Sequence, residues 1–251
     1  DGQDLLTLEK DEFRRLRGNR LSIIFQDPAT TLNPTTTVGG QISEAYLLHH
    51  KQSRIEARNL AIDLLAKVGI NDADLIYDCY PHQLSGGMRQ RAIIAMALIC
   101  EPDLLIADEP TTALDTTVQA QILELLLDLQ DQYGMSILFI SHNLAVISQL
   151  ADNVAVMYAG KIVEILPTED MVTSSLHPYT RGLLETMPSV ERRGQILPTL
   201  MGNLSDRDRF GPGCPFSRRC ALEEEICRVE CPPLSSLNEK HQFACHVVAP
   251  Q

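Results

Sequence analysis

Two adjacent carboxylates, Asp108 and Glu109, follow the short apolar run 104–107. This run comes after Pro102 and predicts a buried strand. Open α/β sheets place their ligands at the carboxyl ends of their strands, so we expect both side chains at such an edge. Two carboxylates there can divide a metal-assisted hydrolysis: Asp108 holds Mg²⁺, usually through water, and Glu109 orients or deprotonates the attacking water. Taken alone, the pair also fits a strand that ends at the surface.

A second candidate site begins at Ser85, which is followed by Gly86 and Gly87. Serine is a favoured N-cap, and the two glycines leave the first helical turn without side chains. Backbone N–H groups and the positive end of the helix could therefore approach a phosphate closely. Apolar residues at helical spacing continue the segment through residue 98. By itself, this motif also fits an ordinary helix cap.

The order of these motifs is more informative than any one of them. The Ser-Gly-Gly helix, the strand ending in Asp-Glu, the turn 113–115 and Ser141-His142 after a further strand follow one another along the chain. Together they resemble the signature motif, Walker B, D-loop and switch histidine of ABC-type ATPases. Gln26, after the apolar strand 21–25, matches the Q-loop glutamine of that family.

The resemblance implies a site for ATP and Mg²⁺. Glu109, His142 and Gln26 would be catalytic, with His142 as the γ-phosphate sensor, and Asp108 and Gln26 would contact the metal. Two such ATPase subunits meet head to tail, so the Ser-Gly-Gly turn would contact the γ-phosphate held by the partner. The nucleotide-binding residues implied are Ser85, Gly86, Gly87, Gln90, Asp108 and Asp115.

One expected motif does not occur in the chain. A phosphate-binding Gly-x-x-x-x-Gly-Lys-Ser/Thr should precede Gln26, yet the only Gly-Lys pair is Gly160-Lys161, which isoleucine follows. In the family this loop lies upstream of the Asp-Gly-Gln-like segment with which the chain opens. We therefore expect an N-terminally truncated chain that is inactive alone, although the full-length protein would be an ATP hydrolase.

The expected fold class is α/β: an incomplete ABC-type P-loop ATPase core with a helical subdomain, plus a small cysteine-rich C-terminal extension. Residues 1–167 would form the ATPase domain, with the helical subdomain at about 27–100, and residues 168–251 the extension. Within the subdomain, Ser53 and Glu56 predict a capping box at the start of a helix.

Composition restricts the partners and the location. Lys and Arg total 21 against 33 Asp and Glu, a net charge of −12, which disfavours a broad nucleic-acid surface. The longest apolar run, 92–100, is too short to cross a bilayer, and no signal-peptide pattern opens the chain. We expect a cytoplasmic protein that sits on a membrane partner.

From residue 168 the chain becomes rich in proline, and the segment His177-Pro178-Tyr179-Thr180-Arg181 follows. This linker and the cysteine tail resemble the ATPase subunits of oligopeptide, dipeptide and nickel importers. The resemblance implies coupling of ATP hydrolysis to uptake of peptides or related solutes, with nickel and glutathione as further possibilities. The implied partners are a second ATPase subunit, two transmembrane permease subunits and an extracytoplasmic solute-binding protein. The implied location is peripheral, on the cytoplasmic face of the inner membrane.

Five of the seven cysteines follow residue 213. In a cytosolic chain this clustering favours metal binding over disulfides. The spacing of the cysteines does not distinguish iron from zinc. The family resemblance implies one [4Fe–4S] cluster, with zinc as the alternative, at Cys214, Cys220, Cys227 and Cys245. Cys231 departs from the family pattern and could replace Cys227 or remain a free thiol. Cys79 and Cys100 are expected to be core residues.

Two rival functions remain open from the sequence. A non-transport ABC ATPase shares the nucleotide motifs but lacks the His-Pro-Tyr linker and the cysteine tail. A metal-binding or redox module with a vestigial ATPase body fits the missing phosphate loop. Co-purification with membrane subunits separates the first rival from an importer, and ATP hydrolysis separates the second.

Overall fold

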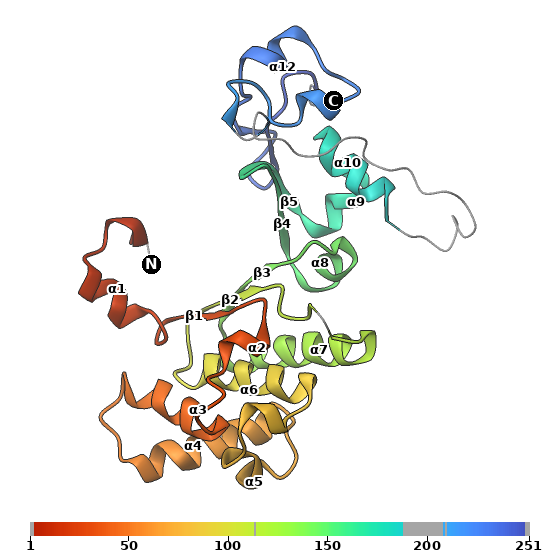
Figure 1. Ribbon diagram of the computed structural model, residues 1–251. Coiled ribbons are helices and arrows are strands. Elements are labelled where there is room, and N and C mark those ends of the chain that lie inside the picture. Colours follow the sequence, from red (N-terminus) through yellow and green to blue (C-terminus); the bar gives the residue numbers. More distant parts are fainter. Residues whose placement is uncertain (1–2, 113, 188–207, 209, 249–251) are drawn as a thin grey trace. The chain divides into compact units, whose positions relative to one another are not determined.

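The computed structural model describes residues 3–112, 114–187, 208 and 210–248. The chain forms two compact units, Asp1–His142 and Asn143–Gln251 (Figure 1). Each unit is described by itself.

The first unit is built on a three-stranded parallel sheet in the order β1-β2-β3. Its register aligns Ile23 with Ile106 and Ile106 with Leu138. Because parallel strands need crossover connections, the chain between them is largely helical. The strands are β1 (Leu21–Ile24), β2 (Leu104–Asp108) and β3 (Ser136–Ile140).

One face of this sheet packs on the helical layer. Ile24 and Leu105 point into a core that they share with residues of α6 (Gly86–Leu98) and α7 (Thr116–Tyr133). These helices run along one side of the sheet (Figure 1). On the opposite face, the aligned Ile23 and Leu138 are exposed, and so is Ile140. The period of two along each strand thus separates a buried face from an exposed apolar one.

The helices that follow β1 in the first unit form a layer beneath the sheet, whereas α1 (Lys10–Leu16) lies to the side of β1 (Figure 1). Ser53 and Glu56 form the predicted capping box at the start of α4, which confirms that expectation. A Cβ on Gly39 would lie 2.0 Å from the Tyr77 ring, so only glycine lets α3 and α5 approach this closely. The helices are α1 (Lys10–Leu16), α2 (Pro28–Thr31), α3 (Val38–Leu47), α4 (Arg54–Lys67), α5 (Ala73–Tyr77), α6 (Gly86–Leu98) and α7 (Thr116–Tyr133), with the 3-10 turns Leu5–Thr7 and Pro81–Gln83.

The second unit contains an antiparallel sheet in the order β4-β5-β7-β6. Ala159 and Gly160 make the β4–β5 turn with φ of 51° and 84°, the left-handed conformation that tight hairpin turns require. The strands are β4 (Asn153–Tyr158), β5 (Lys161–Pro167), β6 (Ser235–Ser236) and β7 (Gln242–Phe243). The helices are α8 (Leu144–Leu150), α9 (Met171–Ser174), α10 (Pro178–Glu185) and α12 (Glu225–Val229), with 3-10 turns at Thr168–Asp170 and Ser217–Arg219.

The C-terminal tail joins this sheet through β7. Phe243 pairs with Glu164, and Gln242 pairs with Ile165, on β5. The sequence predicts strands at 21–25, at 104–107 and directly before Ser141, and the structure confirms all three. It does not predict the two short tail strands. β5 lies inside the predicted ATPase domain 1–167, so the tail pairs directly with a strand of that segment.

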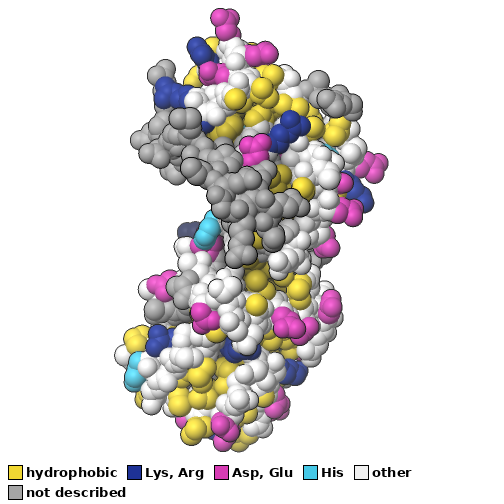
Figure 2. Space-filling view, turned by 90° about the vertical axis from the view of Figure 1, so that its right-hand side faces the viewer, with side chains coloured by type: hydrophobic (Ala, Val, Ile, Leu, Met, Phe, Trp, Pro, Cys, Tyr) yellow, Lys and Arg dark blue, Asp and Glu magenta, His cyan; other side chains and the backbone are white. Residues whose placement is uncertain are grey.

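Two surface properties bear on the expected partners. Among the described residues, no helix is both long and apolar enough to span a bilayer. On the face drawn in Figure 2, Lys and Arg side chains are scattered among acidic and apolar ones, in keeping with the net charge of −12.

Candidate active site and cysteine pocket

The predicted catalytic residues gather where the parallel strands end. β1, β2 and β3 end at Ile24, Asp108 and Ile140, and Gln26, Glu109 and His142 follow directly. Because the three strands are parallel, these ends lie at one edge of the sheet. The structure therefore brings together the glutamine, the carboxylate and the histidine that the sequence singles out.

Glu109 has an unusual backbone conformation. Its φ is 45°, in the left-handed region, and its N–H donates to the carbonyl of Ile140 at 2.9 Å. For a residue with a Cβ, this conformation costs roughly 1 kcal/mol, so the surrounding structure must hold it. The bend after β2 directs Glu109 toward the residues that follow β1 and β3.

Three side chains donate hydrogen bonds to the Glu109 carboxylate. Gln26 Nε2 lies 2.7 Å and Thr112 Oγ1 lies 2.8 Å from Oε2, while His142 Nδ1 lies 2.8 Å from Oε1. A carboxylate only accepts, so the His142 proton is on Nδ1. The bonds from His142, Thr112 and Gln26, in that order, hold the pKa of Glu109 below its usual value despite some desolvation. Glu109 is therefore ionised near neutral pH.

The sequence does not single out Thr112, although a signal is present. Thr112 N donates to the Glu109 carbonyl at 3.1 Å, which closes a turn with Pro110 at its second position. Proline favours that position of a turn, and the turn returns the fourth residue to the first. The Glu-Pro-Thr-Thr sequence is therefore typical of a turn that brings Thr112 back beside Glu109. Asp108 is the last residue of β2, and its side chain is partly exposed at the same edge.

The Ser-Gly-Gly motif begins α6 as predicted. Ser85 is the N-cap and accepts from Met88 N at 3.3 Å, and Ser85 and Gly86 are exposed. A Cβ on Gly87 would lie 3.0 Å from Val118 Cγ1, so the glycine allows α6 and α7 to approach at their first turns. Asp115 caps α7 and accepts from Val118 N at 2.9 Å. The two helix starts thus lie side by side, with Asp115 exposed next to them.

Gln90 lies elsewhere on the same helix. Its side chain is 1% exposed, and both amide atoms are buried without a hydrogen-bond partner in the described part of the chain. The side chain of Gln90 faces the interior, while Ser85 and Gly86 face outward, and its contact with nucleotide stays a prediction. Ala113, in the predicted turn 113–115, lies outside the described residues.

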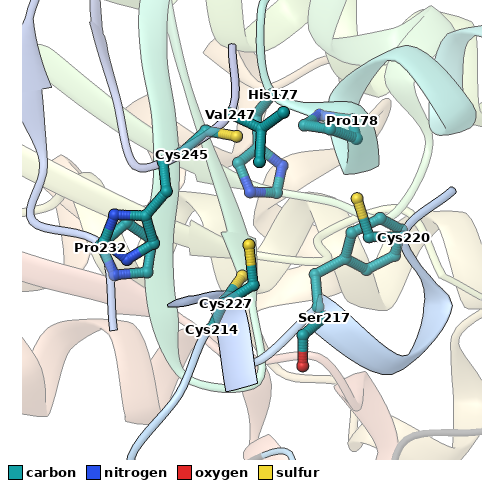
Figure 3. Close-up of a pocket in the computed structure, with 11 residues that line it drawn as sticks. His177, Pro178, Cys214, Ser217, Cys220, Cys227, Pro232, Cys245 and Val247 are labelled. Carbon is teal, nitrogen blue, oxygen red and sulfur yellow. The ribbon is translucent and has the colours of Figure 1, made fainter. Parts of the chain in front are cut away.

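The four tail cysteines with expected metal-binding roles line one pocket of the second unit. Figure 3 shows Cys214, Cys220, Cys227 and Cys245 around it, together with His177. Burial raises the pKa of the Cys214 thiol to about 11 and also raises that of Cys220. The other cysteines contribute to both shifts, in keeping with their proximity.

Backbone packing brings two of these cysteines together. Cys214 N donates to the Cys227 carbonyl at 2.8 Å. A Cβ on Gly213 would lie 2.5 Å from that carbonyl oxygen, so glycine is required for this approach. Gly213 therefore positions Cys214 beside Cys227.

The pocket does not have the geometry of a closed single-ion site. A tetrahedral zinc site with bonds of about 2.3 Å places its sulfur atoms about 3.8 Å apart. Within the ranges that the structure describes, no group of three or more His, Cys, Asp or Glu side chains could hold a metal ion. The expected grouping of the four cysteines is present, whereas the predicted metal is not confirmed.

The remaining cysteines lie outside this pocket. Lys161 Nζ donates to Cys231 Sγ at 3.1 Å, and Cys227 rather than Cys231 lines the pocket. Cys79 and Cys100 pack against the core of the first unit, which confirms their predicted role.

A second carboxylate cluster, centred on Glu164, is not predicted from the sequence. This fully buried residue of β5 accepts from His241 Nε2 at 2.9 Å, from Leu176 N at 2.6 Å and from His177 N at 3.2 Å. It thereby ties β5 to the segment before β7 and to the start of α10. A charged residue inside an apolar strand was the available signal, since buried charges need partners.

Comparison with solved structures defines the class. A dimeric bacterial ABC transporter cassette superimposes with a TM-score of 0.57 at 26% identity, covering 64% of this chain and 68% of that one. A part of an ABC transporter complex from Clostridium perfringens gives a TM-score of 0.56 at 29% identity, covering 65% of this chain and 62% of that one. The fold is that of an ABC transporter ATPase cassette, whose reaction is ATP hydrolysis.

Sequence comparison identifies the family. Residues 1–112 match the ABC transporter family, and residues 163–227 match the oligopeptide/dipeptide transporter C-terminal region. A peptide import ATP-binding protein of Brucella ovis is 49% identical over 96% of this chain and 73% of its own length. The dipeptide transport ATP-binding protein of Bacillus subtilis is 49% identical over 97% of this chain and 72% of its own length. The chain belongs to the peptide-import ATP-binding proteins of ABC transporters.

Proposed function

We propose that this protein is the ATPase subunit of an ABC importer and couples ATP hydrolysis to the uptake of peptides. The observation that carries the proposal is the Glu109 carboxylate, ionised and held by Gln26, Thr112 and His142 at the edge of a parallel sheet. The relatives' names support peptides and dipeptides as the substrate class. Nickel and glutathione are the alternative solutes.

In the proposed mechanism, Glu109 orients the attacking water and accepts its proton. Gln26 uses its amide nitrogen to bind Glu109, so its oxygen is free to join Asp108 in holding Mg²⁺. His142 uses Nδ1 for Glu109, so Nε2 can face the γ-phosphate. When bound, Mg²⁺ neutralises charge that develops on the phosphates. One carboxylate thus links the metal contact, the water and the phosphate sensor.

We propose a head-to-tail pair of ATPase subunits in the assembled protein. The exposed helix start at Ser85, Gly86 and Gly87 would bind the γ-phosphate held by the partner, with Asp115 beside it. Backbone N–H groups at such a start favour anions. The solved cassette of similar fold is a dimer, which supports this arrangement. Two permease subunits and an extracytoplasmic binding protein complete the proposed importer, with this subunit on the cytoplasmic face of the membrane.

Replacing Glu109 tests the catalytic assignment in the full-length protein, with its phosphate-binding loop, assembled with its partner subunits. Glu109→Gln keeps the shape but removes the base, so we expect ATP turnover to fall about 10²- to 10⁴-fold while nucleotide still binds. Glu124→Gln, on the exposed side of α7, is the control and should leave turnover unchanged. Normal turnover in Glu109→Gln would remove Glu109 from the catalytic role.

We also propose that Cys214, Cys220, Cys227 and Cys245 hold one [4Fe–4S] cluster, with zinc as the competing metal. Four cysteines in one pocket provide the complement that such a cluster requires. The resemblance to the peptide-importer family favours the cluster over zinc, since four thiolates suit either metal group.

Anaerobic purification tests the cluster. We expect iron and acid-labile sulfide in equal amounts, lost in Cys214→Ser and in Cys245→Ser. Cys231→Ser is the matched control and should keep both, because Cys231 lies against Lys161 rather than in the pocket. A protein that contains stoichiometric zinc and no sulfide would overturn the cluster.

A further inference from the structure

His177 is a buried residue that the proposed ATPase mechanism does not use. Its side chain is 1% exposed, and it caps α10 by accepting from Tyr179 N at Nδ1, over 3.1 Å. Its own backbone N–H donates to Glu164. Both ends of the residue are therefore fixed, and the ring has a defined orientation.

The hydrogen bond at Nδ1 determines the tautomer. A nitrogen that accepts a hydrogen bond carries no proton, so the proton of the neutral ring is on Nε2. Burial lowers the pKa of His177 to about 4, in keeping with a neutral ring. Nε2–H is thus a fixed donor.

This donor faces the cysteine pocket. His177 lines the pocket together with the four cysteines, and Figure 3 shows its ring directed in among their sulfur atoms. The hydrogen bond from Tyr179 occupies Nδ1, which leaves Nε2–H to face the pocket. Sulfur accepts hydrogen bonds, and a thiolate accepts more strongly than a thiol because it is charged.

We propose that His177 Nε2–H donates a hydrogen bond to sulfur of the metal group held by these cysteines and thereby raises its reduction potential. Hydrogen bonds to sulfur stabilise the more negative, reduced state of an iron–sulfur cluster. His177 is a positioning residue in this role and not a metal ligand. The inference rests on the proposed cluster.

The pocket offers a matched control in His246. This residue also lines the pocket, but its Nε2 lies 3.1 Å from the Glu230 carbonyl and so carries the proton that binds that oxygen. Its Nδ1 then has no proton to donate to sulfur. For His246 we therefore expect no hydrogen bond to sulfur, although it lines the same pocket as His177.

The experiment is an anaerobic redox titration of the full chain, followed by its visible absorption. His177→Asn keeps a good N-cap for α10 but is too short to carry a donor to the position of Nε2. We expect a more negative midpoint potential with unchanged iron and sulfide content. His246→Asn should leave the potential unchanged.

The outcomes separate the two proposals. Iron and sulfide with an unchanged potential in His177→Asn, or an equal shift in His246→Asn, overturn the role of His177 and leave the cluster intact. Wild-type protein without iron and sulfide overturns both.

A second measurement covers loss of iron in His177→Asn. The His246→Asn protein has His177 as its only histidine of the two in the pocket. When this protein is labelled with ¹⁵N-histidine and its cluster is reduced, we expect hyperfine coupling between the cluster's electron spin and the His177 nitrogen, transmitted through the hydrogen bond. Its absence would overturn the role of His177.

Discussion

Two glutamates in this molecule each accept three hydrogen bonds, one of them from a histidine ring, yet their surroundings differ. Glu109 is 20% exposed in its side chain, and its partner His142 is 76% exposed. Glu164 is fully buried, and its partner His241 is nearly so. Partners of Glu109 are all side chains, whereas two donors to Glu164 are backbone N–H groups. An exposed cluster of side chains can exchange its partners for water and phosphate, while a buried one bound to backbone holds the fold.

The largest expected effect is on stability, at Glu164. Glu164→Ala leaves the buried His241 ring and two backbone N–H groups unpaired, so we expect a loss of about 3–5 kcal/mol in the free energy of unfolding. Denaturant unfolding followed by circular dichroism measures it. Glu109→Ala is the comparison variant and should cost less than about 1 kcal/mol, because its partners can bind water. Equal losses in the two variants would mean that burial does not distinguish the clusters.

A smaller effect is expected on activity, at Thr112. Thr112→Val keeps the shape of the side chain and removes one of the three bonds to Glu109. One net hydrogen bond contributes about 1 kcal/mol, so turnover of the assembled protein should fall roughly fivefold. Thr111→Val is the neighbouring control and should leave turnover unchanged. If Thr112→Val has the turnover of the wild type, the hydrogen bond from Thr112 does not contribute to catalysis.

The smallest expected effect is on the pH dependence of stability. The folded state lowers the pKa of Glu109 below 4.5, chiefly through His142 and Thr112. A carboxyl with a lowered pKa contributes stability that is present above its unfolded value and lost as pH falls through its folded value. Stability of the wild type should therefore fall more than that of Glu109→Gln as pH is lowered from about 5. Parallel curves for the two proteins, measured by unfolding at each pH, would contradict this.

The difference between the clusters also explains what could be predicted from the sequence. Gln26, Glu109 and His142 each follow an apolar strand, and the ends of parallel strands meet at one edge, so their proximity was predictable. The left-handed φ of Glu109 and the bond from Thr112 depend on the path of the turn, which residue types do not determine. The capping box at Ser53 was predictable because it is local.

Glu164 could not be assigned a partner from the sequence. His241 lies 77 positions along the chain from it, and their contact depends on the register of strands only two residues long. Strands of two residues are too short to show the alternation of apolar and polar residues from which a strand is predicted. The family resemblance predicted that the four cysteines lie together. Their spacing in the sequence alone does not predict which cysteines are neighbours. The burial of Gln90 was likewise not predicted. The order of the motifs predicts a helix at this place, but it does not predict which way each side chain of the helix points.

The bonds from Leu176 N and His177 N to Glu164 have a consequence for local opening of the second unit. These amides precede a short helix, where exchange with solvent is usually fast because such segments open independently. Here their acceptor belongs to β5, and the same carboxylate binds His241 near β7. Leu176 and His177 can lose their protection only when Glu164 is released. Their amide hydrogens should therefore exchange as slowly as those of β5, so that linker, strand and tail open as one cooperative unit.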